Sequence, residues 1–277
     1  MSFTNHSSFK LGILGGGQLG KMLLQITNKW GIETYVLDPA EDCPAANTCT
    51  HFVKGDFTDK QTVIDFGKMV DVITIEIENV NTEALFELIK LGKSVFPQPA
   101  VINTIQDKGL QKEFYKQHHL PTSSFFLVSN KEEILIAYKE QKIKIPFVQK
   151  LRKGGYDGRG VYVIKNESDL PQLMDAPSVI EECVNIKKEI SVIVARDVDG
   201  NVKAYPPTEM LVNEKANLLD LLQSPATLSK EKTTEAVELA KKTINAFGLT
   251  GILAVELFVD KNDNLLSLIT TINIDNI

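Results

Sequence analysis

The first hundred residues alternate short apolar segments with segments of helical periodicity, and this alternation constrains the fold more than any other feature. Residues 10–14 and 33–37 have the length and the apolar composition of buried strands. Between them, five apolar side chains recur at the spacing of an amphipathic helix: Leu19, Met22, Leu23, Ile26 and Trp30. Strands that alternate with helices predict a parallel sheet covered by helices.

The alternation continues to a pair of prolines, Pro97 and Pro99, which indicate a domain boundary. The segments before them are interpreted as a helix, a strand, a helix and a short strand, at residues 60–68, 72–77, 82–91 and 94–96. The sequence therefore predicts an α/β domain over residues 1–97.

Beyond the boundary the pattern becomes that of an α+β unit with an antiparallel sheet. The expected helices cover residues 105–118, 132–142 and a segment that Ser229 can cap and Gly248 can end. The expected strands lie near Phe125 and at residues 146–151, 161–164, 178–184, 189–195, 202–205, 251–259 and 265–269. We expect two lobes here, at residues 98–176 and 177–277.

The composition is that of a globular protein. The 277 residues, 43% of them hydrophobic, are enough for about two domains. Apolar runs stay shorter than the ~20 residues that span a bilayer, and the N-terminal segment is polar, so we expect a soluble cytoplasmic protein without a membrane partner. A net charge of −6 argues against nucleic-acid binding, and the three cysteines and four histidines lack metal-binding spacing.

A glycine-rich run, Gly154 to Gly160, lies between two of the predicted strands. Glycine lets a backbone approach a ligand closely and adopt positive φ, so such a loop can lie over phosphates. The strand on each side distinguishes it from a P-loop, which leads into a helix. The run also contains Tyr156, Asp157 and Arg159, which favour a functional loop over a mobile surface turn.

A second glycine-rich turn, Gly15 to Gly20, lies between the first strand and the first helix. Its spacing and Asp38 at the end of the next strand fit a dinucleotide-binding turn, which by itself predicts NAD. The same geometry offers a helix N-terminus to a phosphorylated substrate, and a purely structural turn is the third interpretation.

Two glutamates in the last predicted lobe are candidates for metal or ligand binding. Strand alternation places Glu256 on one face with Ile252 and Phe258, where an ionised carboxylate is costly unless a cation compensates it. Mg²⁺ is the usual cation where phosphates are also bound. Glu189 is open to the same interpretation, and the alternative for both is a carboxylate paired with a lysine at a sheet edge.

Two lysines and two strand ends complete the candidates. Lys108 and Lys150 could converge on a polyphosphate, although each could also be a solvated surface residue. The segment Glu181 to Val184 leaves a strand for a connector, where backbone groups could bind a purine edge. In the first domain, Thr74, Glu76 and Glu78 share a strand face near its carboxyl end, where α/β sheets bind ligands.

These motifs together resemble the ATP-grasp family, and within it the N5-carboxyaminoimidazole ribonucleotide synthetases of purine biosynthesis. The resemblance runs from about Leu11 to Leu266. It is carried by GGGQLG at 15–20, EIENV at 76–80, GGYDGRG at 154–160 and AVELFV at 254–259. It implies a Rossmann-like domain followed by two ATP-grasp lobes that bind ATP between them, usually in a homodimer.

The resemblance also implies roles for individual residues. ATP would contact Lys108, Lys150, Gly155, Gly158, Gly160, Val161, Glu181, Glu182, Cys183, Val184 and Glu189. Glu256 would bind Mg²⁺, whereas Tyr156, Asp157 and Arg159 would lie near bicarbonate and the attacking amine. Gly17, Gln18, Leu19 and Glu76 would line the pocket for 5-aminoimidazole ribonucleotide. The family reaction uses ATP and bicarbonate to make the N5-carbamate, ADP and phosphate.

The sequence departs from the family pattern after Leu266. The family continues there with Asn-Glu, the second metal-ligating carboxylate, and then with segments that meet the substrate phosphate. This chain has no glutamate after Glu256, and we expect that neither Asp263 nor Asp275 replaces it. We therefore also consider a truncated or impaired member that only binds ATP or dimerises, and, as a more distant alternative, an NAD-dependent oxidoreductase.

Overall fold

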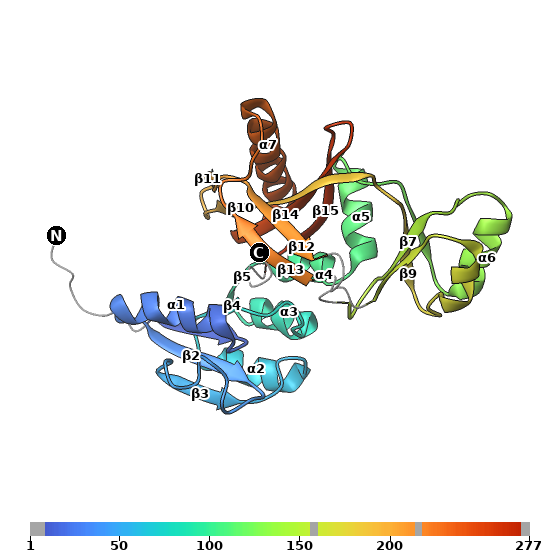
Figure 1. The fold of residues 1–277 in the computed structure, drawn as a ribbon. Coiled ribbons are helices and arrows are strands. Elements are labelled where there is room, and N and C mark those ends of the chain that lie inside the picture. The colour runs from blue at the N-terminus through green and yellow to red at the C-terminus, as the bar shows by residue number, and fades with distance from the viewer. Residues whose placement is uncertain (1–8, 156–159, 214–217, 273–277) are drawn as a thin grey trace.

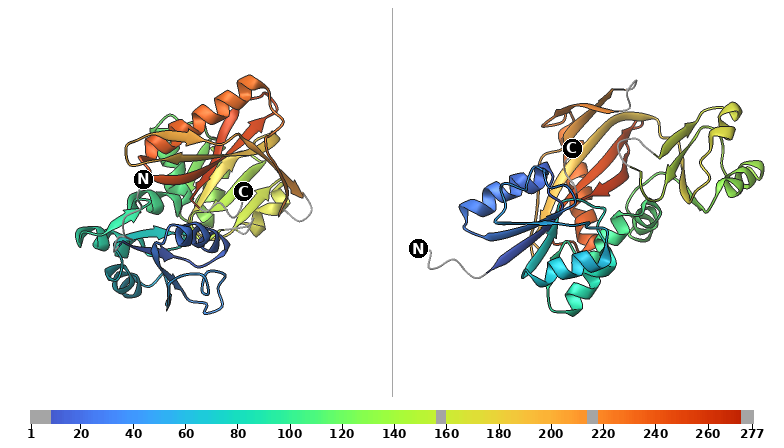
Figure 2. Two further views of the ribbon diagram at one scale, coloured as in Figure 1. Left: turned by 90° about the vertical axis from the view of Figure 1, so that its left-hand side faces the viewer. Right: turned by 90° about the horizontal axis from the view of Figure 1, so that it is seen from below.

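The computed structural model describes residues 9–155, 160–213 and 218–272, which form three regions, each built around its own sheet. Figure 1 shows the N-terminal domain at the lower left, the small lobe at the right, and the large lobe above and between them. Figure 2 shows the same three regions from the side and from below. Within the described ranges, no helix is both long and apolar enough to cross a membrane.

The N-terminal domain is a parallel sheet in the strand order β3-β2-β1-β4-β5, as the alternation predicts. Two buried apolar clusters include residues of this sheet and of the helices around it. Its strands are β1 (Lys10–Leu14), β2 (Glu33–Asp38), β3 (His51–Lys54), β4 (Val72–Ile75) and β5 (Ser94–Phe96), and its helices are α1 (Gln18–Lys29), α2 (Lys60–Lys68) and α3 (Thr82–Lys90). Strand β3 is absent from the sequence-based prediction.

Helix α1 presents its apolar stripe largely to solvent. Met22 is 60% and Trp30 68% exposed, whereas Gly20, Leu24 and Thr27 are buried. Gly20 lies so close to the Gly15 carbonyl oxygen that an added Cβ would stand 3.2 Å from it. We infer that this close approach decides which face of α1 meets the sheet, since the apolar spacing alone would favour the other one.

The small lobe has an antiparallel sheet in the order β6-β9-β7-β8. Its strands are β6 (Phe125–Val128), β7 (Phe147–Leu151), β8 (Val161–Ile164) and β9 (Ser178–Glu182), with α6 (Lys131–Lys139) and a 3-10 turn (Glu167–Gln172) packed on one face. Strands β7 and β8 form the predicted hairpin around the glycine-rich run.

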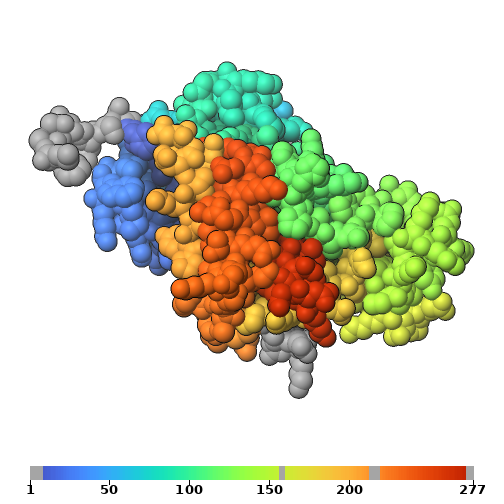
Figure 3. Space-filling view, turned by 90° about the horizontal axis from the view of Figure 1, so that it is seen from above, coloured from blue at the N-terminus to red at the C-terminus, as the bar shows by residue number. Residues whose placement is uncertain are grey.

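The large lobe is a longer antiparallel sheet in the order β13-β12-β10-β14-β15, with β11 beside β10. Its strands are β10 (Ile186–Arg196), β11 (Val202–Ala204), β12 (Thr208–Asn213), β13 (Leu218–Gln223), β14 (Gly251–Asp260) and β15 (Leu265–Thr271). Helix α7 (Lys230–Phe247) packs on one face of this sheet and appears in orange in Figure 3. Ser229 caps α7 and Gly248 ends it in the left-handed conformation, as predicted.

The helix expected at 105–118 corresponds to α5 (Lys108–Gln117), whereas the short helix before it, α4 (Pro99–Ile105), is absent from the prediction. The chain breaks at Asp107, whose carboxylate accepts hydrogen bonds from the first turn of α5 and pairs with Arg152 at 2.8 Å. Tyr115 on α5 belongs to the apolar core of the large lobe. Helix α5 therefore connects the large lobe to the glycine-loop hairpin of the small lobe.

Candidate active site

A buried carboxylate, Glu181 at the end of β9, lies between two lysines from different elements. Its Oε1 is 3.0 Å from Lys150 Nζ on β7, and its Oε2 is 2.8 Å from Lys112 Nζ on α5. Ser123 Oγ donates a third bond to Oε2 at 2.6 Å. Burial alone would raise the pKa of Glu181, but these partners lower it to about 2. We call Lys112, Ser123, Lys150 and Glu181 the Glu181 cluster.

Lys108 begins α5 beside this cluster. Its Nζ donates to the Gly155 carbonyl oxygen at 3.1 Å, which ties the start of α5 to the glycine-rich run. Burial and the nearby charge of Lys150 lower the pKa of Lys108. Two ammonium groups that destabilise one another beside a glycine loop are stabilised by a bound polyanion.

The described residues of the glycine-rich run are Gly154, Gly155 and Gly160, and Val161 follows the run as the first residue of β8. Gly160 has φ +74°, and its carbonyl oxygen accepts from Leu151 N at 2.8 Å, which closes the hairpin. Gly154 also has positive φ, so the loop uses the conformational freedom of glycine at both ends. Tyr156, Asp157, Gly158 and Arg159 lie outside the described residues.

The connector from β9 to β10 joins the two lobes. Glu182 is exposed, and Cys183 and Val184 are half-buried in this connector. Glu182 N donates to the Ser124 carbonyl oxygen at 3.0 Å, which anchors the start of the connector to the small lobe. The structure therefore places Cys183 and Val184 next to the Glu181 cluster, between the two sheets.

Glu256 is half-buried on the face of β14 that points away from α7. Burial, the charge of Glu189 and the charge of Glu78 raise the pKa of Glu256 to about 7. Burial also raises the pKa of Glu189 on the adjacent strand β10. The three carboxylates thus form an electronegative region that faces Lys108 and Lys150.

The cross-strand neighbours of Glu256 test whether Mg²⁺ fits here. On β10 the residue opposite Glu256 is Ser191, whose buried Oγ has no hydrogen-bond partner among the described residues. On β15 the opposite residue is Ile269, which offers no ligand. No group of three histidine, cysteine, aspartate or glutamate side chains within the described ranges could hold a metal. Two oxygen-bearing side chains, the Glu256 carboxylate and the Ser191 hydroxyl, thus face each other here, and the β15 side of Glu256 adds no oxygen.

Asp263 does not complete this set. It lies in the turn between β14 and β15, where its exposed carboxylate pairs with Lys187 at 2.7 Å. The other candidate, Asp275, lies outside the described residues. Asp263 cannot share a cation with Glu256, as expected, because the turn is at the far end of the hairpin from Ile269.

The turn at Gly15 to Gly20 is closed by two carboxylates of the N-terminal domain. Asp38 accepts hydrogen bonds from Gly16 N at 2.8 Å and from Ala40 N at 2.8 Å. Glu76 lies over the turn, since a Cβ added to Gly17 would stand 2.4 Å from its Oε1. A negative charge therefore occupies the space that a dinucleotide pyrophosphate needs, which disfavours NAD. Near Glu76, Gln18 is exposed and Leu19 half-buried.

The end of β4 meets the end of β15. Glu78 Oε1 accepts hydrogen bonds from Thr271 Oγ1 and, at 3.0 Å, from Ile272 N. Gln106 Nε2 donates to the Glu78 carbonyl oxygen at 2.6 Å and to that of Val80 at 2.9 Å. The N-terminal domain and the large lobe are thus fastened together beside the three-carboxylate region.

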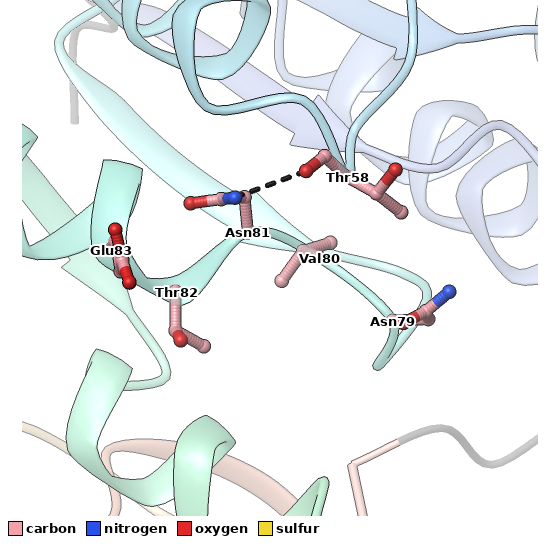
Figure 4. A pocket seen from close by; sticks show the side chains of 6 residues that line it. All are labelled: Thr58, Asn79, Val80, Asn81, Thr82 and Glu83. Carbon is pink, nitrogen blue, oxygen red and sulfur yellow. Dashed lines mark hydrogen bonds between the residues drawn. The ribbon is translucent and has the colours of Figure 1, made fainter. Parts of the chain in front are cut away.

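A polar pocket borders this strand end, as Figure 4 shows. Residues 79–83 and Thr58 line it, and Asn81 Nδ2 donates to the Thr58 carbonyl oxygen at 3.0 Å. Asn81 also caps α3 through Ala84 N. These bonds hold the loop after Glu78 in place.

Sequence reasoning missed Lys112, Ser123 and Gln106. Lys112 follows Lys108 by four residues, so both lie on one helix face, and this spacing was a usable signal. No comparable signal marked Ser123 or Gln106, because their partners are distant in the sequence.

Two family models match the chain: the ribonucleotide synthetase preATP-grasp domain over residues 9–106 and the ATP-grasp domain over residues 113–270. The chain is 35% identical over 260 residues to the N5-carboxyaminoimidazole ribonucleotide synthase of Staphylococcus aureus strain COL. This alignment covers 92% of this chain and 67% of that protein. The chain is 34% identical over 262 residues to the chloroplastic phosphoribosylaminoimidazole carboxylase of Vigna aconitifolia, across 92% of this chain and 46% of that protein.

A solved structure shows the same architecture. The N5-carboxyaminoimidazole synthase of Aspergillus clavatus, in complex with ADP and 5-aminoimidazole ribonucleotide, superimposes with a TM-score of 0.88 at 31% identity, covering 97% of this chain and 71% of that one. The chain thus spans about half the length of the plant relative and about two thirds of the bacterial one. It belongs to the ATP-grasp family, and within it to the N5-carboxyaminoimidazole ribonucleotide synthases.

Proposed function

We propose that this chain is an ATP-dependent ligase of purine biosynthesis that carboxylates 5-aminoimidazole ribonucleotide with bicarbonate. The products are N5-carboxyaminoimidazole ribonucleotide, ADP and phosphate. The names of the relatives and the two ligands in the Aspergillus structure support this proposal. A homodimer and a cytoplasmic location are part of the same proposal.

The observation that carries the proposal is the meeting of the three regions at one place. Glu78, in the loop that follows β4, contributes to the electrostatic environment of Lys108 and Glu256. A substrate at the strand ends of the N-terminal domain would therefore lie beside a phosphate-binding pair of lysines. A ligase that transfers a phosphoryl group before it joins two molecules needs such proximity.

In the reaction, the γ-phosphoryl group of ATP passes to bicarbonate to give carboxyphosphate, and the amine of the ribonucleotide then attacks the carboxyl carbon and releases phosphate. We assign Lys108 and Lys150 to the phosphates, where their charges stabilise the transferring group. The segment 155–161 would cover the site and exclude water from the labile intermediate. Arg159 would hold the bicarbonate anion, with Tyr156 and Asp157 near the amine.

The remaining contacts follow from the same arrangement. The connector 181–184 would bind the adenine edge, and Glu189 the ribose. Gly17, Gln18, Leu19 and Glu76 would line the ribonucleotide pocket. Glu256 in its ionised form, with Ser191, would hold Mg²⁺, which when bound adds positive charge at the phosphates.

A second candidate function is an ATP-binding module of the same family with impaired catalysis. Ile269 favours it, because a side chain without oxygen stands directly opposite Glu256. Both candidates predict ATP binding, and they differ only in turnover.

Phosphate release tests the proposal. The purified chain is mixed with Mg²⁺-ATP, and phosphate is measured with bicarbonate and 5-aminoimidazole ribonucleotide added separately and together. We expect release that requires both substrates and falls at least a hundredfold in Lys150→Ala. ATP binding without substrate-dependent release would favour the impaired module, and no ATP binding would reject both.

A further inference from the structure

Lys112 is a buried lysine that no ligand can reach directly. Its side chain is 3% exposed on α5, one turn beyond Lys108. Its ammonium group lies 2.7 Å from Thr122 Oγ1, 3.0 Å from Ser123 Oγ and 2.8 Å from Glu181 Oε2. An ammonium has three donors, so these three partners use all of them. Lys112 therefore acts on the site only through its neighbours.

Glu181 is the neighbour through which Lys112 reaches Lys150. The carboxylate uses Oε2 for Lys112 and Oε1 for Lys150. Lys150 is 13% exposed, which makes it the accessible lysine of the pair. Without Lys112, Glu181 and Lys150 would form a closed ion pair with no net charge. With Lys112 present, the three groups together carry one positive charge.

We propose that Lys112 is a positioning residue that shares the charge of Glu181 and so keeps the Lys150 ammonium available to the phosphates of a bound nucleotide. The inference rests on the proposed ATP-binding function. Interactions between close charges are strong at low dielectric. When Glu181 interacts with two lysines, its attraction for each of them is weaker than its attraction for a single lysine would be. Lys112 would thus adjust affinity for phosphate without touching it.

The charge of Lys112 also makes the proposal testable by pH. Burial lowers the pKa of Lys112 to about 8, against the opposing effect of Glu181 on β9 and with a further lowering by Lys150 on β7. Above that pH Lys112 becomes neutral, and Glu181 then pairs with Lys150 alone. Phosphate groups lose their second proton near pH 6, so the nucleotide itself does not titrate in this range.

The experiment measures ADP and ATP binding by calorimetry from pH 6.5 to 9.5, at constant ionic strength and excess Mg²⁺. Four proteins are compared: wild type, Lys112→Met, Lys112→Arg and Lys116→Met. Lys116 lies on the same helix and is exposed, so Lys116→Met is the matched control.

We expect wild-type affinity to fall about tenfold between pH 7 and 9, and Lys116→Met to follow it. Lys112→Met should bind about tenfold more weakly at pH 7 with no further loss up to pH 9. Lys112→Arg should match wild type at pH 7 and keep its affinity above pH 8, because arginine stays protonated.

A wild-type profile parallel to that of Lys112→Arg, or Lys112→Met with wild-type affinity and the wild-type pH dependence, would overturn the inference. A purely structural role would lower thermal stability and leave the pH profile of binding unchanged, which also rejects it. If Lys112→Met does not fold, the wild-type and Lys112→Arg profiles decide. If wild type binds neither nucleotide, the proposed function itself fails, which is a distinct result.

Discussion

Glu181 in the small lobe and Glu256 in the large lobe are two sheltered carboxylates that the fold treats in opposite ways. Glu181 contacts two lysines and a serine, and its pKa falls to about 2. Glu256 has two further glutamates as its strongest charged neighbours, and its pKa rises to about 7. The lysines thus compensate Glu181, whereas at Glu256 burial and the two glutamates outweigh the opposing charges of Lys150 and Lys108.

The difference indicates which group is structural and which is reserved for a ligand. A buried charge without a partner is costly, so a protein retains one mainly where a ligand or a reaction uses it. The partners of Glu181 come from α5, β7 and the segment before β6, which fixes the small lobe to α5. Glu256 gains comparable compensation only when a cation binds.

The largest expected effect is that of Glu181→Gln. The change leaves Lys112 buried with no opposing charge, so we expect unfolding free energy to fall by about 3 kcal/mol or more. The measurement is urea unfolding at pH 7. Without Glu181, which raises the pKa of Lys112, the lysine of the variant loses its proton below pH 8, so the deficit should shrink as the pH rises towards 8.

The acid side gives a second readout for this variant. The folded-state pKa of Glu181 lies below its unfolded value of 4.5, so wild type loses this stabilisation as the pH falls from 4.5 towards 2. Glu181→Gln should lack that loss. Asp263→Asn, which breaks the exposed pair with Lys187, is the control and should change stability by no more than about 1 kcal/mol. If Glu181→Gln and Asp263→Asn both changed stability only slightly, burial would not explain why the Glu181 ion pairs should matter more than the exposed pair of Asp263.

The second largest expected effect is a gain in stability, caused by Glu256→Gln. Because the pKa of Glu256 rises from 4.5 to about 7 on folding, wild type loses stability as the pH rises through that range. One pKa unit corresponds to about 1.4 kcal/mol, so with allowance for partial exposure we expect Glu256→Gln to be more stable by about 2 kcal/mol at pH 8. Thermal unfolding without Mg²⁺ measures this gain.

The same variant supplies its own control at low pH. At pH 4, wild-type Glu256 is mainly protonated in both states, so the two proteins should unfold at nearly the same temperature. A variant that is less stable than wild type at pH 8 would contradict the idea that Glu256 is uncompensated.

The smallest expected effect is on Mg²⁺ affinity, and it comes from adding a second carboxylate opposite Glu256. Ile269→Glu places a second carboxylate across from Glu256, where facing Cβ atoms are about 5 Å apart and can share one cation. We expect Mg²⁺ to bind at least tenfold more tightly, about 1.4 kcal/mol, by calorimetry without nucleotide.

Ile252→Glu is the matched control for this substitution. Ile252 lies on β14, on the same face as Glu256, but is exposed and four residues away. Ile252→Glu should therefore leave Mg²⁺ affinity unchanged. Equal effects of the two substitutions would indicate only a general attraction by added negative charge.

Much of the fold could be predicted, because the relevant signals are local. Strand and helix periodicity in the first hundred residues indicated the parallel sheet, and Ser229 and Gly248 marked the ends of α7. The short helix α4 was missed, although Pro99 at its start and Asp107 as the N-cap of α5 are both local signals. Apolar spacing does not indicate which face of α1 is buried, since Gly20 and Leu24 are buried and Met22 is exposed.

The candidate site also has a part that the sequence indicates and a part that only the tertiary structure decides. The sequence by itself indicated the family, the glycine-rich hairpin, the two lysines that we assign to the phosphates and the unusual Glu256, because each is a residue type in a short pattern. Only the tertiary structure decided that Lys112 shares Glu181 with Lys150, that Ile269 faces Glu256, and that Glu78 contacts the end of β15. Those facts depend on charges and strand registers that join distant segments, and a charge has no fixed pKa or partner until folding sets its neighbours.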